Sequence, residues 1–485
     1  METKKSGYSS RFALICVLIG GSVGTGNLWR FPRLVANTGG AAFIIVMTVC
    51  VFLTALPLLY VENFMGRATR HSAPGAFHDI CGKKYTCLGM FATLAYLLML
   101  AYYLVVLAWC LRYAGMSLTG GYFGVDKEAL FTSVTTADPA TIGVWVVALV
   151  LVYFGIAKQE ALEKVSSILM PCLFGLLIGL VVYALTRKGA YDGLKYSFTL
   201  NPKSLVDINI WKEALTQVAW SIGPGTMMMI TAAMVSHKDG DITLNSHVQA
   251  FGDMTVALLG TVCVLPIIFA NALSPEAASE ICASGNNGLT FIAMTSLVEK
   301  MPGGYLMGIL FFVSLLMAGL SSNICHFMIC SLPLVDAGKD RKKSILGVFV
   351  LLLIWGLPSA WNSTFLSNQD WVAGQMMIVG VMFSCYAMIK FGVSKIRGTY
   401  LNNPYTGLKI GKWWEVSIRF IAPIIAGIMF VWWTAQCIGW EANWWNPFGV
   451  NNLGTFVFQG GLMAIIAYAM NKKVVNATPE AVVPE

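Results

Sequence analysis

Short runs rich in glycine and hydroxyl groups interrupt two apolar stretches of this sequence. Residues 20–27 read GGSVGTGN, and residues 221–226 read SIGPGT. Glycine weakens a helix and proline removes a backbone donor, so each helix should break there. Within hydrocarbon, an unwound backbone must be buried in protein or face a cavity, because unpaired amides and carbonyls cost several kcal/mol each. The paired breaks predict a binding site where freed carbonyls bind a cation and half-helix amide ends bind an anion.

Two ionisable residues, Asp253 and His326, lie inside apolar stretches. A charge at that depth is costly, so Asp253 is a candidate functional residue and His326 a candidate for carrying a proton. Plainer interpretations stay open, namely a protonated Asp253 hydrogen-bonded inside the bundle and a histidine that only joins two helices. Gly20 and Gly24 are also spaced for close helix packing, although the second break favours a binding site.

The composition excludes an ordinary soluble protein. Hydrophobic residues make up 57% of the 485 positions and charged residues 12%, about half the charge of a typical soluble chain. Twelve apolar stretches recur, each long enough to cross a hydrocarbon core of about 30 Å as a helix. We therefore expect an all-α integral membrane protein with a single domain, residues 1–485. The stretches centre near Val23, Leu53, Leu100, Val147, Gly175, Trp220, Leu259, Leu315, Leu351, Ile378, Ile425 and Ala464.

The basic residues predict the orientation. In a twelve-helix arrangement, 22 of the 32 Lys and Arg residues lie on the side that holds both termini, so both termini should be cytoplasmic and the protein multi-pass in the plasma (cell inner) membrane. Basic residues in the loop at 187–212 oppose this trend. The segment 12–19 could alternatively be a signal peptide. The net charge of +8 follows this loop bias, so no nucleic-acid partner is expected, and the twelve scattered cysteines show no metal-ligand spacing.

Several motifs resemble the neurotransmitter:sodium symporter family, which includes the bacterial leucine transporter. Residues 24–32 read GTGNLWRFP, residues 39–43 read GGAAF, and residues 318–322 read AGLSS. The resemblance also covers Pro57-Leu58, Glu62, Met65-Gly66-Arg67, Tyr102-Tyr103, Gln217 and Asp370. It implies the leucine-transporter (LeuT) fold of twelve transmembrane helices. Residues 12–186 and 211–392 would form two inverted five-helix repeats with broken helices 1 and 6, and residues 417–471 two appended helices.

The resemblance implies a sodium-coupled symporter that imports a small amino acid or related amine by alternating access, with one or two sodium ions. One sodium site would consist of neutral oxygens, as a hard cation prefers. Its ligands would be the carbonyls of Gly20, Val23 and Ala318 and the hydroxyls of Ser321 and Ser322.

The second implied sodium site departs from the family pattern. It would use Ser22, Asn27, Ser221 and position 253, where the family has Asn and this chain has Asp253. Asp253 could ligate sodium with a full charge, or supply the anion that chloride or an acid supplies in other members. It could also replace a substrate carboxylate, which would allow a carboxylate-free amine. Because Ala257 and Met47 replace the family's acid and chloride-site tyrosine, chloride is not expected.

The implied substrate pocket shows a similar mixture of fit and departure. The amides of Thr25 and Gly26 and the Tyr103 hydroxyl would hold a carboxylate. Gly24 lacks the acid that monoamine transporters place there, which favours an amino acid. Carbonyls of Ser22, Trp220, Ser221 and Gly223 would bind the ammonium group. Met99, Trp220, Thr226, Ser322 and His326 would shape the side-chain pocket, where His326 could select a polar side chain or take part in proton coupling.

Two charge pairs are candidate gates. Arg30 with Asp370 would close the outer path above Trp220 and Tyr103, and Lys5 with Asp336 the inner path. A lysine clamps less firmly than an arginine because it lacks the bidentate fork. Alternatively, Lys5 could form only a surface pair.

Three other functions are weaker interpretations. Two breaks with opposed gates favour alternating access over a channel. A membrane enzyme is not expected, because no nucleophile motif or metal-ligand set accompanies Glu62, Asp253 and His326, and no catalytic residue is assigned. A non-transporting receptor of the same fold would bind ligand without uptake. The expected partners are the small-molecule substrate and membrane lipid. The protein is expected to be a monomer or a homodimer.

Overall fold

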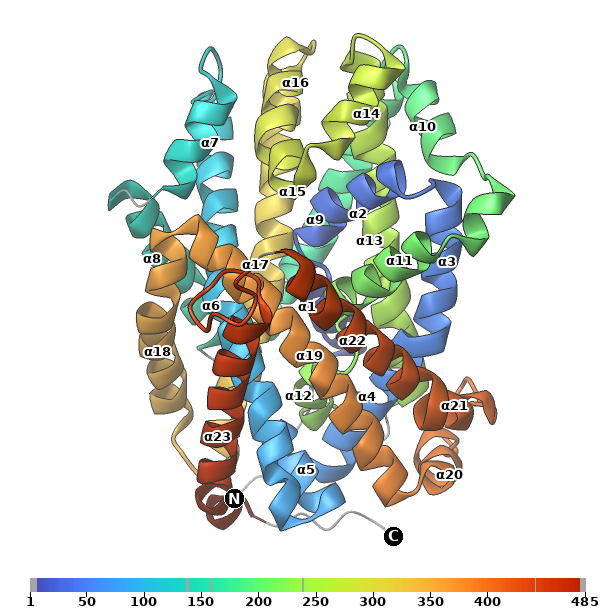
Figure 1. The fold of residues 1–485 in the computed structure, drawn as a ribbon, viewed down its shortest axis with the longest axis vertical. Coiled ribbons are helices and arrows are strands. Elements are labelled where there is room, and N and C mark those ends of the chain that lie inside the picture. Colours follow the sequence, from blue (N-terminus) through green and yellow to red (C-terminus); the bar gives the residue numbers. More distant parts are fainter. Residues whose placement is uncertain (1–6, 137–138, 158, 238–239, 441, 480–485) are drawn as a thin grey trace.

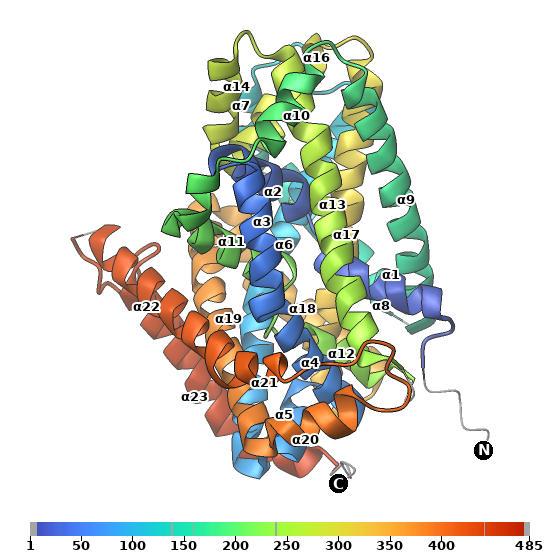
Figure 2. The same cartoon turned by 90° about the vertical axis from the view of Figure 1, so that its right-hand side faces the viewer.

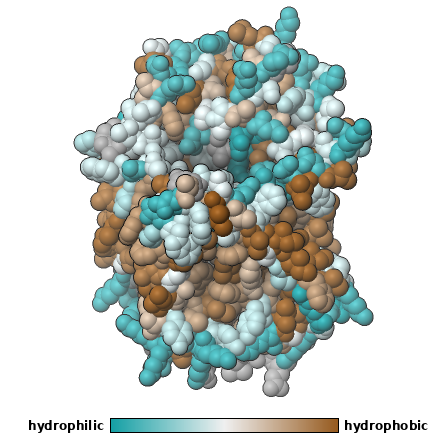
Figure 3. Space-filling model, viewed as in Figure 1, coloured by the Kyte–Doolittle hydropathy of each residue, from teal (hydrophilic) through white to brown (hydrophobic). Residues whose placement is uncertain are grey.

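The chain forms a bundle of helices. The structure is a computed structural model that describes all residues except 1–6, 137–138, 158, 238–239, 441 and 480–485 (Figure 1). Within the described residues there are helices but no strands, which confirms the all-α prediction. Hydrophobic side chains gather in a band around the middle of the molecule, and hydrophilic side chains gather at both ends (Figure 3).

In the described part of the chain, ten helical segments are long and apolar enough to cross a membrane. An eleventh span is the bent pair α1 (Arg11–Ser22) and α2 (Gly26–Asn37), whose axes differ by 54°. The long single segments are α3 (Ala41–Cys50) continued by η1 (Val51–Ala55) and α4 (Leu56–Thr69), α6 (Thr86–Thr119), α8 (Pro139–Ile156), α9 (Gln159–Leu185), α13 (Ile242–Asn271), α17 (Gly304–Asp336), α18 (Arg341–Trp361), α19 (Ser363–Phe391), α22 (Ala422–Trp440) with α21 (Trp413–Val416) and η6 (Ser417–Ile421), and α23 (Leu453–Ala477).

The stretch centred near Trp220 does not form one long helix. It divides into α11 (Ile208–Ser221) and the short α12 (Met228–Met234), separated by residues 222–227. Because neither piece is long enough to span a membrane alone, the structure shows ten or eleven spans by length and composition where twelve were predicted. The break at Gly223 causes the difference.

Shorter helices connect the spans and cover the ends of the bundle. Polar side chains at several helix starts accept hydrogen bonds from amides three residues ahead, as Asp241, Asp340, Asn362 and Asn452 do, which satisfies donors that the helix leaves free. The remaining elements are α5 (Ala73–Cys81), η2 (Lys83–Tyr85), α7 (Lys127–Thr135), α10 (Ala190–Phe198), η3 (Pro202–Val206), α14 (Pro275–Ala283), α15 (Gly285–Asn287), η4 (Gly288–Ala293), α16 (Met294–Lys300), α20 (Val393–Lys395) and η5 (Ile396–Leu401).

The two broken helices lie inside the bundle. Helix α1 contacts α9, α13 and α17, α2 contacts α13, and α12 contacts α4 and α17. Figure 2 shows α1 and α2 crossing behind α13 and α3. The helices that surround the breaks therefore bring side chains from distant parts of the sequence to the unwound backbone.

Candidate functional site

Side chains compensate for the lost helix hydrogen bonds at the first break. Val23 has an extended backbone (φ −64°, ψ 117°), so the helix stops there. The Gly24 amide donates to Asn27 Oδ1 at 2.9 Å, and the Thr25 amide donates to the Tyr103 hydroxyl at 3.2 Å. Both donors are buried and must find partners. Asn27 and Tyr103 therefore stabilise the break by replacing the missing helical hydrogen bonds.

Glu62 stabilises the second break. Gly223 and Gly225 have φ values of +66° and +80°, in the left-handed region that favours glycine. The Glu62 carboxylate accepts a hydrogen bond from the Met229 amide at 2.8 Å and faces the amides of Gly225 and Thr226. From the sequence, Glu62 was named only as part of the family resemblance and as a possible acid or base of a membrane enzyme. The sequence did not reveal that this acid binds the free amide end of α12.

A cavity of about 810 Å³ lies between the two breaks. Its walls come from the α1–α2 and α11–α12 breaks and from α6, α17 and α19. The structure brings all twelve predicted substrate residues to this one cavity. They are Ser22, Gly24, Thr25, Gly26, Met99, Tyr103, Trp220, Ser221, Gly223, Thr226, Ser322 and His326.

Neutral oxygens converge where α1 meets α17. The Ser321 hydroxyl lies 3.1 Å from the Gly20 carbonyl oxygen and 3.0 Å from the Ala318 carbonyl oxygen. The Ser322 hydroxyl lies 3.2 Å from the same Ala318 oxygen. Together with Val23, a predicted fifth ligand that is fully buried, we call these groups the neutral ion site, a candidate for the first sodium site that the sequence predicts. The donor set is the one that a hard monovalent cation prefers.

The second group of candidate ligands contains a carboxylate, that of Asp253, at the point where α13 faces both breaks. Asp253 accepts hydrogen bonds from Asn27 Nδ2 at 2.8 Å and from the Ser221 hydroxyl at 2.7 Å, one on each oxygen. These three residues and Ser22 are the carboxylate ion site. Gln249, one helical turn before Asp253, donates to the Ser22 hydroxyl at 2.6 Å. Sequence reasoning missed Gln249, although its spacing of four residues places it on the same face of α13 as Asp253.

The structure does not form the predicted outer ion pair. Arg30 instead pairs with Glu213 on α11, with Nη2 and Oε2 4.0 Å apart. Asp370 Oδ1 accepts a hydrogen bond from the Tyr102 hydroxyl at 2.7 Å. Each member of the predicted pair is thus engaged elsewhere, because Glu213 and Tyr102 lie closer. Trp220, the predicted lid, is 36% exposed. The predicted Arg30–Asp370 ion pair therefore does not close the cavity in this structure.

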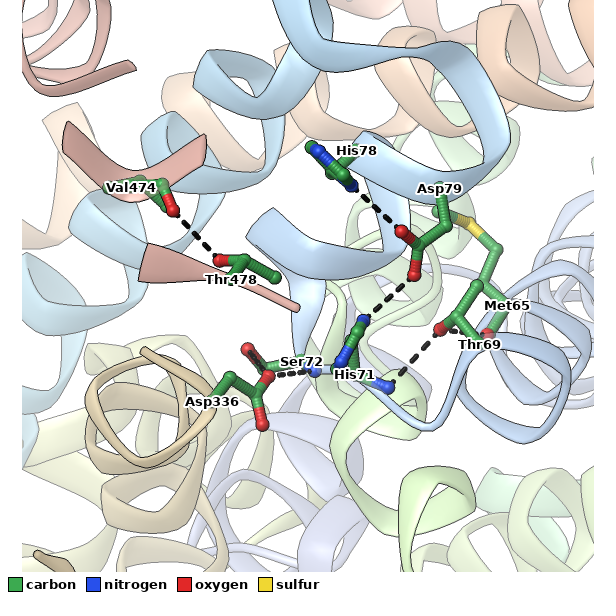
Figure 4. A network of polar contacts seen from close by, with 9 residues as sticks. All are labelled: Met65, Thr69, His71, Ser72, His78, Asp79, Asp336, Val474 and Thr478. Carbon is green, nitrogen blue, oxygen red and sulfur yellow. Dashed lines mark hydrogen bonds and ion pairs between the residues drawn. The ribbon is translucent and has the colours of Figure 1, made fainter. Parts of the chain in front are cut away.

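Only half of the predicted inner gate can be placed. Lys5 lies outside the described residues. Asp336, at the end of α17, accepts hydrogen bonds from the amide and hydroxyl of Ser72 (Figure 4). Nearby, Asp79 binds His71 and His78, with each oxygen 2.8 Å from a ring nitrogen (Figure 4). This end of the bundle is tied together by polar contacts.

Known proteins share this architecture and these motifs. The chain matches the sodium:neurotransmitter symporter family over residues 5–123 and 130–476. The chain belongs to this family. It is 27% identical to an uncharacterized sodium-dependent transporter of Methanocaldococcus jannaschii, over 87% of this chain and 89% of the relative. It is 23% identical to the rat sodium-dependent neutral amino acid transporter B(0)AT1, over 87% of this chain and 80% of the relative.

A solved structure supports the same conclusion. The crystal structure of MhsT in complex with L-phenylalanine is similar with a TM-score of 0.74 and 25% identity, and the match covers 88% of this chain and 99% of MhsT. This member of the sodium:neurotransmitter symporter family is a sodium-dependent, multi-pass membrane transporter with the LeuT fold, and it is not an enzyme. The family resemblance predicted from the short motifs is confirmed.

Proposed function

We propose that this transporter imports a small amino acid together with sodium, by exposing the cavity between the two broken helices alternately to each side of the membrane. The observation that carries the proposal is the convergence of the Gly20 carbonyl, the Ala318 carbonyl and the Ser321 hydroxyl within 3.1 Å. This site joins α1 to α17, so a bound cation would stabilise one arrangement of the two helices over another.

Adjacent groups suit an α-amino acid. The amide of Gly26 and the hydroxyl of Tyr103 would bind the substrate carboxylate, and carbonyls at the second break would bind its ammonium group. A Cβ atom on Gly24 would lie 2.6 Å from the Tyr103 hydroxyl oxygen, so this pocket has no room for an acid there. A neutral amino acid transporter among the relatives and the bound L-phenylalanine of MhsT support the same class of substrate.

Asp253 supports a second candidate function. Its carboxylate is fully buried and held by Asn27 and Ser221, where the substrate carboxylate would meet sodium in relatives that bind amino acids. A carboxylate supplied by the protein would allow transport of an amine that has none. A receptor of the same fold would bind either ligand without uptake.

The two broken spans favour twelve crossings. If the bent pair α1–α2 and the interrupted pair α11–α12 each cross once, they and the ten long segments make twelve crossings, an even number that returns the chain to the side where it began. The pair α11 and α12 then supplies the twelfth. Together with the excess of Lys and Arg on that side, this supports cytoplasmic termini and a plasma-membrane location. The inverted repeats at 12–186 and 211–392, and the appended helices at 417–471, belong to the same proposal.

The number of ions determines how steep a gradient the protein maintains. Two sodium ions crossing 100 mV and a tenfold gradient release roughly 7 kcal/mol, which would concentrate a neutral solute about 10⁵-fold. One ion would support a few hundredfold. We propose that the neutral ion site binds one ion and that the carboxylate ion site binds a second without chloride.

The test is uptake by the purified protein in liposomes. A pool of labelled amino acids and amines is offered with an inward gradient of sodium, potassium or choline, and with chloride or gluconate as the anion. We expect saturable amino acid uptake with sodium alone, unchanged within about twofold when gluconate replaces chloride. Accumulation without a sodium gradient, or sodium-dependent binding without uptake, would exclude the proposed symport.

A further inference from the structure

We propose that the cavity selects amino acids whose side chain ends in a neutral hydrogen-bond donor, a hydroxyl or a carboxamide, and that His326, Tyr96 and Thr226 accept those hydrogen bonds. This inference rests on the proposed amino acid transport and names the class of substrate. Its basis is the direction of the hydrogen bonds around these three side chains.

The three residues form one polar wall of the cavity. Tyr96 comes from α6, Thr226 from the break before α12, and His326 from α17, and all three line the cavity between the breaks. The rings of Tyr96 and His326 meet edge to face, with centroids 5.3 Å apart. The His326 residue is 9% exposed, and Tyr96 and Thr226 less. Polar groups buried this deeply need partners.

His326 presents an acceptor. Because the helix stops at Val23, the Thr25 amide binds Tyr103 and leaves the Gly21 carbonyl without its helical donor. The His326 ring faces the backbone of Gly21. A ring nitrogen that pairs with this carbonyl carries the proton, so in a neutral ring the other nitrogen is an acceptor. That nitrogen, Nδ1, is buried and has no partner.

Tyr96 and Thr226 also present acceptors, because both hydroxyl groups already donate their hydrogen to other protein groups. The Tyr96 hydroxyl donates to Thr226 Oγ1 at 3.2 Å, and the Thr226 hydroxyl donates to the Gly223 carbonyl. Both hydroxyl protons are therefore used within the protein. Each oxygen keeps a lone pair, so a ligand can bind these groups only by donating.

Charge restricts the donor to a neutral group. Among the described residues that line the cavity, the acids are Glu213 and Asp370, and they lie by Arg30 and Tyr102 at the outer end. Glu62 lies behind the wall, but its carboxylate is bound by the amides of the second break, so a cationic side chain would meet no free carboxylate beside His326. An anionic side chain would face only acceptors. A hydroxyl or a carboxamide meets neither obstacle.

Aliphatic side chains should bind less tightly at this wall. An apolar group would displace water from the acceptors without replacing its hydrogen bonds, which costs about 1–3 kcal/mol for each buried group left unpaired. That range corresponds to about 5- to 150-fold in affinity. The comparison is cleanest between ligands of equal size.

The experiment measures sodium-dependent binding of matched amino acids to the full-length protein, by thermal shift and by competition for uptake in liposomes. The pairs are threonine with valine and asparagine with leucine, and aspartate serves as the anionic analogue. We expect threonine and asparagine to bind about 10-fold or more tightly than valine and leucine, and aspartate to bind weakly. Equal or reversed rankings in the unmodified protein would overturn the proposal.

Substitutions assign the effect to the wall. His326→Leu removes the unpartnered acceptor, so the preference within each pair should fall about 10-fold, and Thr226→Val should also reduce it. If His326→Leu binds sodium-dependently and keeps the full preference, the role of His326 is wrong. Ser314→Ala is the matched control, because Ser314 is a buried hydroxyl of α17 that binds Leu310 away from the cavity.

The outcomes separate this inference from the proposed function. If no amino acid binds or is taken up with sodium, the proposed symport fails and the inference fails with it. If amino acids are transported but apolar members of the pairs are preferred, the symport stands and only the donor selectivity is wrong.

Discussion

The neutral ion site and the carboxylate ion site share the broken helix α1–α2 but differ in how they are satisfied. At the neutral ion site, hydroxyls of Ser321 and Ser322 approach backbone carbonyls of two helices, and no side chain carries a formal charge. At the carboxylate ion site, both oxygens of Asp253 already accept hydrogen bonds from Asn27 and Ser221. A bound cation would be the only formal charge at the neutral ion site, whereas the carboxylate ion site already carries an acid within a closed hydrogen-bond network.

This difference separates two roles for an ion. A cation bound only by neutral oxygens has no carboxylate to attract it. Its affinity therefore depends on how closely the oxygens of α1 and α17 approach, so its binding would favour one arrangement of these helices. A cation beside Asp253 neutralises a buried charge, whose isolation is costly. We infer that coupling to motion resides chiefly at the neutral ion site, and that Asp253 sets the charge balance of the substrate cavity.

The largest expected effect follows from removing the hydroxyls of the neutral ion site. Ser321→Ala with Ser322→Ala deletes two of its five proposed ligands, and we expect sodium-driven uptake to fall more than about 100-fold, since each lost ligand to a buried cation costs on the order of 1.5–3 kcal/mol. Initial rates of uptake in liposomes measure the effect.

Ser314→Ala controls for the loss of a buried hydroxyl from α17. Ser314 donates to the Leu310 carbonyl within the same helix and does not line the cavity, so uptake should stay within about twofold. Normal sodium-driven uptake in the double variant would show that the neutral ion site is only a contact between helices.

A smaller effect is expected at the carboxylate ion site. Asp253→Ala leaves Asn27 Nδ2 and the Ser221 hydroxyl without their main acceptor, and we expect the sodium concentration for half-maximal uptake to rise about 10- to 100-fold. Asp253→Asn keeps an oxygen ligand and should raise it less. Sodium titrations of uptake measure both variants.

Thr255→Ala is the control on the same helix, because its hydroxyl binds Phe251 on the exposed face of α13. If Asp253→Ala leaves the sodium dependence unchanged while uptake continues, Asp253 is a structural carboxyl group. The two sites would then differ in function as well as in chemistry, and a single ion would drive transport.

The resemblance to the family grouped Gly20, Ala318 and Ser321, and the structure brings these three residues into contact. That they bind sodium stays a prediction, whereas the helix breaks beside them could be predicted from glycine and proline alone. Hydropathy likewise located the spans. It placed a single crossing near Trp220, but the Gly223 break leaves α12 only seven residues long, too short to be recognised by length.

Other features depend on three-dimensional competition that sequence patterns do not encode. Arg30 was assigned to Asp370, yet Glu213 and Tyr102 engage the two partners, because they lie within reach in the folded chain. Glu62 satisfies amides more than 160 residues away. Gln249 could have been found from its spacing to Asp253, but only after Asp253 had been placed in the site.

The smallest expected effect is on stability and comes from His71, at the end of the bundle that holds Asp336. Measuring it separates the pH dependence due to His71 from any that is due to Asp253. Burial lowers the pKa of His71, but the hydrogen bond and charge of Asp79, with Asp336 nearby, outweigh it and leave the pKa raised above its usual value near 6.5. A raised pKa means that the folded state binds the proton more tightly. The stabilisation is therefore fully present below about pH 6.5 and is lost as the pH rises through the raised value.

We expect His71→Gln to remove this pH-dependent term. Because the side chain is partly exposed, the term should be below about 1 kcal/mol, or about 1 °C in Tm for a chain of this length. Between pH 6 and pH 8, the Tm of the unmodified protein should fall relative to the variant, as measured by thermal unfolding in detergent. Parallel curves would show that His71 keeps one protonation state. A pH effect on uptake that persists in His71→Gln and disappears in Asp253→Asn would then belong to the carboxylate ion site.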